Sequence, residues 1–287
     1  MKFRKAIIVL LACVALPLRL WAETEDPSGA TFVSLDGKAV LAGNPLENVP
    51  DAHLIKEVKD PVLWLFRSQV AAPQGTVLLC PGGGYRCLEM RNEGVNTARF
   101  LNQQGFDVAI LEYRIAAPQI PDPKELALAD AVKSFRLLKS SASSLGIHDG
   151  RLAIMGYSAG GHLAARTVEN LGENDQPDGL ILVYPAYLEK TIPGKATPAV
   201  VPPPKPRRLL AVIAANDNPN WVKSCQEYSE AWKKSGGDSI FHLLSDGGHG
   251  YGIAANSDNS NQHWPDLLKA FLQTKSGPAI NPVSPTR

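Results

Sequence analysis

A serine flanked by glycines is the first feature of this sequence that could carry out a reaction. Residues 156–160 read Gly-Tyr-Ser-Ala-Gly and lie between a predicted strand that ends at Met155 and a predicted helix. A tight strand-to-helix turn strains the backbone of the serine and exposes its hydroxyl, and the glycines are needed because side chains there would collide with the neighbouring strand or helix. Five common residues can also occur together by chance, but their position argues against that interpretation. We therefore expect Ser158 to be a nucleophile.

A general base for this serine is expected late in the chain. A hydroxyl is a weak nucleophile at neutral pH, so it needs a base within hydrogen-bond reach and an acid that holds the base in one tautomer. Of the six histidines, His249 lies in the glycine-rich segment 246–252, directly after a predicted strand. His162 follows the serine and is expected to pack against the turn, whereas His263 begins the last helix. The chain order serine, acid, histidine favours His249 as the base.

The acid is expected in a loop between these two residues. Asp217 follows the predicted strand 209–214 and has the required position. Asp246 is the alternative, but a carboxylate three residues before His249 is more typical of a loop cap that accepts backbone N–H groups. We favour Asp217 because of its loop position.

A run of glycines could bind the negative charge that develops on the substrate. Residues 81–85 read Pro-Gly-Gly-Gly-Tyr and follow the predicted strand 76–80. Glycines let backbone N–H groups approach an oxyanion, so we expect the N–H groups of Gly83, Gly84 and Ala159 to form an oxyanion hole. A plain turn and a phosphate-binding loop are the alternatives, and no Gly-Lys-Ser/Thr follows to favour the latter.

Alternating strands and helices must position these residues. Apolar runs and helical spacing predict strands at 60–69, 76–80, 107–113, 151–155, 179–184, 209–214 and 239–244, and helices at 95–104, 122–145, 159–171, 221–234 and 263–272. This alternation predicts an α/β fold, a mostly parallel sheet with helices on both faces, whose ligands bind at the carboxyl ends of the strands. The proline-rich segment 185–207 is expected to be a surface insertion.

The amino-terminal residues differ from the rest of the chain. Three basic residues within residues 1–5 precede an apolar run, residues 6–18. This pattern predicts a signal peptide, residues 1–22, followed by a single domain, residues 23–287, in a secreted or periplasmic protein. The run is short for a bilayer, so we expect no integral membrane span after processing, with an uncleaved anchor or lipidation at Cys13 as alternatives.

Charge and composition disfavour several other functions. Without residues 1–22 the chain has 25 Lys and Arg against 28 Asp and Glu, a net charge of −3. There is no clustered basic stripe that would indicate nucleic-acid binding, and no Cys/His spacing typical of zinc, so we expect neither metal nor cofactor. Three cysteines remain, and whether Cys80 and Cys87 form a disulfide stays open.

Five short motifs together resemble one known family. They are CPGGGY at 80–85, EG at 93–94, YR at 113–114, GYSAGGH at 156–162 and GGHGYG at 247–252. In this order they resemble the bacterial esterase/lipase family of α/β hydrolases, and most of all its acetyl-xylan-esterase-like carbohydrate esterases. The resemblance implies the α/β-hydrolase fold, a triad of Ser158, Asp217 and His249, and an oxyanion hole in the glycine loop. The chain departs from many relatives at Pro81, where they have histidine, and before Asp217, where Ala-Ala-Asn replaces their usual His-Gly.

The expected function is that of a secreted serine esterase acting on short-chain esters, acetyl esters of carbohydrate above all. The substrate would be a small-molecule or polysaccharide ester, since the proline-rich insertion has no long apolar stretch to hold a lipid chain. A serine peptidase of the same fold, a lactone hydrolase and a noncatalytic binding protein are the alternatives; lactone hydrolases of the dienelactone type usually have cysteine at the position of Ser158. Tyr85, Tyr157 and Tyr251 lie beside the motifs and either line the pocket or pack in the core.

Overall fold

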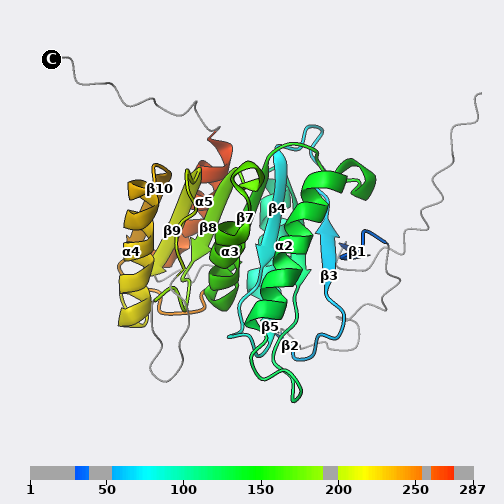
Figure 1. Cartoon of the computed structure of the whole chain (residues 1–287). Helices are drawn as coiled ribbons and strands as arrows, with labels where there is room; N and C mark the ends of the chain where they lie inside the picture. Colours follow the sequence, from blue (N-terminus) through cyan, green and yellow to red (C-terminus); the bar gives the residue numbers. More distant parts are fainter. Residues whose placement is uncertain (1–29, 39–53, 190–199, 254–259, 275–287) are drawn as a thin grey trace, which may run out of the picture.

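The structure, a computed structural model, is built on one eight-stranded sheet (Figure 1). It describes residues 30–38, 54–189, 200–253 and 260–274, and the predicted signal peptide lies outside these residues. In spatial order the strands are β1 (Ala30–Ser34), β3 (Val62–Phe66), β6 (Phe106–Glu112), β4 (Gly75–Cys80), β7 (Leu152–Tyr157), β8 (Gly179–Val183), β9 (Arg208–Ala214) and β10 (Asp238–Leu244). In this spatial order, every neighbouring pair from β6 through β4 to β10 is parallel, whereas β3 pairs antiparallel with β1 and β6. The sheet is therefore mostly parallel, as predicted.

Helices cover both faces of this sheet. In the view of Figure 1, α2 (Lys124–Ser141) and α3 (Ser158–Asn170) lie in front of the sheet and α5 (Trp264–Gln273) lies behind it. Helix α4 (Pro219–Lys234) packs against β9 and β10, and α1 (Asn96–Gln103) packs against β3 and β6. Every residue of β4, β7, β8 and β9 is buried, which explains why these strands are continuous apolar runs without alternation.

Short elements complete the described part of the chain. They are the two-stranded sheet β2 (Leu54–Ile55) and β5 (Leu88–Glu89), the π-helical turn η1 (Arg91–Val95), and the 3₁₀ turns η2 (Ser143–Leu145), η3 (Glu173–Asp175) and η4 (Ser260–His263). The sequence did not predict β1 or the small sheet: β2 and β5 have two residues each, too few for a pattern, and β1 is defined by its pairing with β3. The helix predicted at 122–145 ends at Ser141, and η2 and a left-handed Gly146 follow.

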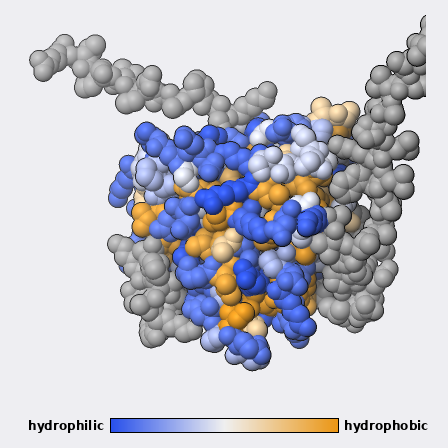
Figure 2. Space-filling model, turned by 45° about the vertical axis from the view of Figure 1, so that its right-hand side comes forward, coloured by the Kyte–Doolittle hydropathy of each residue, from blue (hydrophilic) through white to orange (hydrophobic). Residues whose placement is uncertain are grey.

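The proline-rich segment carries no regular structure where it is described. Residues 185–189 and 200–207 form neither helix nor strand, and the remainder lies outside the described residues. Ala186, Leu188 and Val200 are buried, so these parts of the segment pack against the core and do not lie at the surface as expected. Figure 2 shows hydrophilic residues on the surface interspersed with hydrophobic patches. Within the described part of the chain, no helix is long and apolar enough to cross a membrane.

Candidate active site

The turn between β7 and α3 holds Ser158 in a strained conformation. The φ angle of Ser158 is 50°, in the left-handed region that a residue with a side chain rarely adopts. A Cβ on Gly156 would overlap the carbonyl oxygen of Gly160, and a Cβ on Gly160 would overlap that of Cys80 at the end of β4. The two glycines of the motif are thus required by the close approach of helix and strand, as the sequence predicted.

The structure brings Ser158, His249 and Asp217 into one hydrogen-bonded chain. Ser158 Oγ lies 2.8 Å from His249 Nε2, and His249 Nδ1 lies 2.8 Å from Asp217 Oδ2. A carboxylate can only accept, so Nδ1 carries the proton and Nε2 is free to accept the serine proton. The side chain of Asp217 is 1% exposed, whereas Ser158 is partly exposed. The geometry therefore selects Asp217, and not Asp246, as the partner of the imidazole.

Two asparagines beside Asp217 fix the loops that carry the acid and the histidine. Asn216 Oδ1 accepts the N–H of Gly248, so the two loops are joined directly next to the imidazole. The Asn218 N–H donates to Asp217 Oδ1, and its side chain caps α4 by accepting the Asn220 N–H. The sequence indicated the acid but not these supporting amides, because a partner 32 residues away leaves no local pattern.

Two aromatic rings pack against the imidazole of His249. The Trp221 ring centroid lies 4.7 Å from it, and the Tyr184 centroid lies 5.0 Å from it with the rings 63° apart. Trp221 lies in the first turns of α4 and Tyr184 directly follows β8. Neither residue was predicted to belong to the site, since each reaches the imidazole only through the fold.

The backbone around Ser158 offers N–H groups to an oxyanion. Gly83 and Gly84 have φ angles of 126° and 65°, and among the described residues their N–H groups have no hydrogen-bond partner. The N–H of Ala159 belongs to the first turn of α3, where N–H groups have no acceptor within the helix and the positive end of the helix dipole lies. Gly82, the first glycine of the loop, is packed against Ser158 Cβ, so the glycine loop and the first turn of α3 both lie beside the serine.

Gly82 itself is engaged by a buried glutamate. Its N–H donates to Glu93 Oε2 at 2.6 Å, and Tyr184 Oη donates to Glu93 Oε1 at 2.8 Å. Glu93 is 5% exposed, and burial raises the pKa of its carboxyl from 4.5 to about 7 although both hydrogen bonds act to lower it. Glu93 stands in a sequence motif, but its place beside the glycine loop became visible only in the structure.

The remaining candidates have structural roles. His162 is buried on α3 and bonded through Nδ1 to the hydroxyl of Tyr85, and burial lowers its pKa to about 3, so it packs against the turn as predicted. Tyr85, Tyr157 and Tyr251 are all buried, which favours the packing interpretation. Cys80 and Cys87 carry free thiols, and no group of three described side chains could hold a metal ion.

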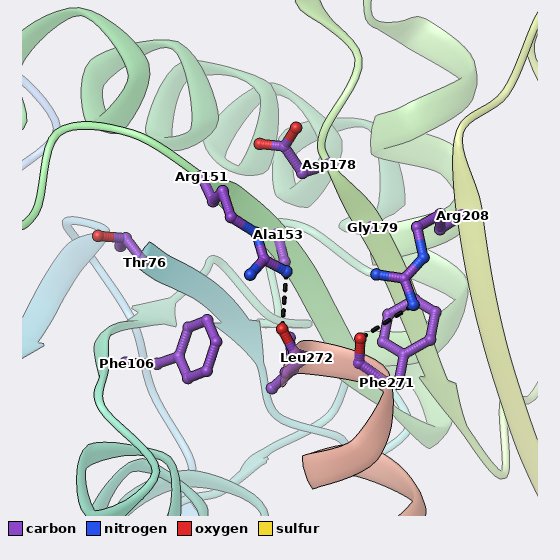
Figure 3. Close-up of a pocket in the computed structure, with 9 residues that line it drawn as sticks. All are labelled: Thr76, Phe106, Arg151, Ala153, Asp178, Gly179, Arg208, Phe271 and Leu272. Atoms are coloured by element: carbon purple, nitrogen blue, oxygen red, sulfur yellow. Dashed lines mark hydrogen bonds between the residues drawn. The ribbon is translucent and has the colours of Figure 1, made fainter. Parts of the chain in front are cut away.

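A hollow lies at the end of the sheet opposite to Ser158 (Figure 3). Thr76, Arg151, Gly179 and Arg208, at the amino ends of their strands, help to line it, whereas Ser158 follows the carboxyl end of β7. Arg151 donates to Leu272 O and Arg208 donates to Phe271 O, both in the last turn of α5. The two arginines thus pair with carbonyl groups at a helix end that have no donor within the helix, which gives this hollow a structural explanation.

Known proteins similar to this chain share one fold. A family model described as alpha/beta hydrolase fold matches residues 77–202. An acetyl ester-xyloside bifunctional hydrolase from Caldicellulosiruptor lactoaceticus superposes with a TM-score of 0.65 at 21% identity, covering 85% of this chain and 95% of that chain. A propionate-bound esterase from Thermogutta terrifontis superposes with a TM-score of 0.61 at 21% identity, covering 75% of this chain and 89% of that chain.

One relative with a similar sequence is a longer protein. An acetylxylan esterase of Xylanibacter ruminicola is 26% identical in an alignment of 225 positions, which covers 68% of this chain and 45% of that protein. This chain therefore spans less than half the length of the curated relative.

Proposed function

Because this chain has the α/β-hydrolase fold, we propose that it is a serine esterase with Ser158 as nucleophile, His249 as general base and Asp217 as the acid. The observation that carries the proposal is the hydrogen-bonded chain from Ser158 Oγ through the imidazole to Asp217. An accessible serine at the end of this chain has the base it needs to attack a carbonyl carbon.

The first half of the reaction forms an acyl-enzyme. Ser158 Oγ attacks the ester carbonyl carbon while its proton passes to His249 Nε2. The carbonyl oxygen becomes an oxyanion that accepts the N–H groups of Gly83, Gly84 and Ala159. Asp217 stabilises the imidazolium through Nδ1–H. When the carbon–oxygen bond to the leaving group breaks, His249 returns the proton to the departing alcohol.

The second half releases the acid. Water enters where the alcohol left and gives a proton to His249 Nε2 as its oxygen attacks the acyl carbon. Collapse of this second tetrahedral intermediate returns the proton to Ser158 Oγ. Water is the only co-reactant, which agrees with a function that needs no metal and no cofactor.

Short acyl groups on carbohydrate are the proposed substrates. Support comes from the acetylxylan esterase relative and from the structural neighbour described as an acetyl ester-xyloside bifunctional hydrolase. Export, which residues 1–22 indicate by their basic start and apolar run, would bring the enzyme to extracellular polymers. We therefore propose a secreted or periplasmic acetylesterase; amino-terminal sequencing of the exported protein, with a new terminus after Ala22, tests this location.

Hydrolysis of p-nitrophenyl acetate and butyrate by residues 23–287 tests the activity. We expect turnover that is faster with acetate and that disappears in Ser158→Ala. Release of acetate from acetylated xylan then tests whether the alcohol part of the substrate is a carbohydrate. A peptide substrate is assayed in parallel because the same triad serves peptidases: cleavage of the peptide alone would replace the esterase proposal, and no turnover of any substrate would favour a noncatalytic binding protein.

A further inference from the structure

The carboxylate of Glu93 joins two loops that the reaction needs in a fixed arrangement. On one side Oε2 accepts the N–H of Gly82, the first glycine of the loop that presents Gly83 and Gly84. On the other side Oε1 accepts the hydroxyl proton of Tyr184. The oxygen of the same hydroxyl accepts the N–H of Gly252 at 2.8 Å, three residues after His249. A continuous hydrogen-bonded bridge therefore runs from the oxyanion loop to the loop of the general base.

This bridge lies directly against the reacting groups. A Cβ on Gly82 would lie 2.6 Å from Glu93 Oε2 and 2.9 Å from Ser158 Cβ, so the side chains of the glutamate and the serine both pack closely against this glycine. The ring of Tyr184 contacts the imidazole of His249, and Trp264 Nε1 donates to Gly252 O. Movement of the carboxylate would therefore displace both the oxyanion donors and the imidazole.

Only an ionised carboxylate lets every donor of the bridge keep an acceptor. Both oxygens of Glu93 accept, whereas a carboxylic acid has one hydroxyl that must donate. That proton could go only to Tyr184 Oη, which already accepts from Gly252, and the tyrosine hydroxyl would lose its acceptor. The titratable groups that face Glu93 are Glu89, Cys87, Tyr113, Tyr157, Tyr184 and His249.

We propose that Glu93 is a positioning residue for ester hydrolysis, whose buried carboxylate holds the oxyanion loop and the His249 loop together through Gly82 and Tyr184. The proposal rests on the proposed function, but it assigns a role to a residue outside the triad. Since the bridge acts on geometry and touches no substrate, its loss lowers kcat and leaves KM nearly unchanged.

Two substitutions break the bridge at different atoms. Glu93→Gln replaces one acceptor by an amide that donates, and Tyr184→Phe removes the hydroxyl that reaches Gly252. We expect each folded variant to lose roughly 10- to 100-fold in kcat, because small misplacements of reacting groups cost this much. The kcat of the double variant should be no lower than that of the less active single variant, since both substitutions break the same connection.

Matched controls separate this effect from a general loss of packing. Glu112→Gln changes a half-buried glutamate that accepts from Trp64 Nε1 in β3, away from the site. Tyr228→Phe removes a buried hydroxyl that has no partner among the described residues. We expect both controls to keep the wild-type kcat, and melting temperatures confirm that every variant is folded.

The pH profile of kcat/KM provides a readout that a packing role would not move. Burial raises the pKa of Glu93 to about 7, so the wild-type profile should contain an ionisation near neutral pH that comes from the Glu93 carboxyl. In Glu93→Gln this ionisation should be absent. If the wild-type protein hydrolyses esters but Glu93→Gln or Tyr184→Phe keeps kcat within twofold, or the effects of the two multiply, the positioning role is wrong. Inactivity of the wild-type protein would instead contradict the proposed function.

Discussion

Ser158 and His249 are separated by 91 residues in the chain, yet Ser158 Oγ lies 2.8 Å from His249 Nε2. The serine follows β7 and the histidine follows β10, and the strands between them are parallel. All their carboxyl ends therefore meet at one edge of the sheet, so loops distant in sequence can form a single site.

Removing the nucleophile should abolish most of the activity. We expect Ser158→Ala to lower kcat by roughly 10³-fold or more, because no other group in the triad can form the acyl-enzyme. His249→Ala should cost a similar factor, and the double variant should be no worse than either single one. Steady-state hydrolysis of p-nitrophenyl acetate measures all three, and multiplicative losses would show that the residues do not act as a unit.

Replacing the acid should affect the imidazole more than the fold. Asp217→Asn removes the acceptor that fixes the proton on His249 Nδ1, and the wrong tautomer would direct an N–H toward Ser158. We expect a loss of roughly 10³- to 10⁴-fold in kcat. Asp246→Asn, at the alternative acid, should cost far less; a reversal of these two results would reassign the acid.

Most of the sheet and the three triad positions could be predicted from the sequence because their signals are local. Buried parallel strands such as β4 and β8 are continuous apolar runs, and Gly156 and Gly160 mark a turn that only glycine permits. The catalytic role of the triad remains a proposal, although the predicted residues lie together.

The supports of the site could not be predicted because their partners are distant in sequence. Glu93 and Tyr184 are 91 residues apart, and Asn216 reaches Gly248 across 32 residues. None of these residues stands in a local sequence pattern that identifies its partner, and only the fold shows that they are in contact. Strand β1 was missed for the same reason, since it is defined by pairing with β3.

The turn of Ser158 should not accept even one added methyl group. Gly160→Ala would place a Cβ on the carbonyl oxygens of Cys80 and Pro81, so helix α3 or the glycine loop must shift. We expect a lower melting temperature and loss of esterase activity. Gly172→Ala, where an added Cβ meets nothing within 4 Å, is the matched control and should behave as wild type. A fully active Gly160→Ala protein would contradict the close approach.

Ionisation of Glu93 should lower the stability of the fold. Burial raises its pKa from 4.5 to about 7, so between these values the folded protein holds a proton that the unfolded chain has released. The free energy of unfolding must then fall as pH rises through this window, by on the order of 3 kcal/mol at about 1.4 kcal/mol per pKa unit. Gln at this position does not titrate.

Urea denaturation at pH 5 and pH 8 measures this effect. The stability of Glu93→Gln relative to wild type should improve at the higher pH, while that of Glu112→Gln should change less. The same difference at both pH values would mean that the folded-state pKa of Glu93 is not raised.

The arginine at the far end of the sheet should matter for stability alone. Arg208 donates to Phe271 O and Thr274 O and lies over the Phe271 ring, so it secures the end of α5. We expect Arg208→Ala to lower the free energy of unfolding by roughly 1–3 kcal/mol, because buried carbonyl groups lose their donors. The kcat of the folded variant should match wild type, and a large loss of kcat would indicate a functional link to the site.

Covalent labelling of the serine tests the central claim most directly. Paraoxon transfers its diethylphosphoryl group to an activated serine and releases p-nitrophenol, and mass spectrometry of the digested protein locates the group. We predict one group per chain, on Ser158, with hydrolysis of p-nitrophenyl acetate falling in proportion to labelling and no label in Ser158→Ala. Labelling at another residue, or full ester hydrolysis by protein labelled at Ser158, would contradict the account.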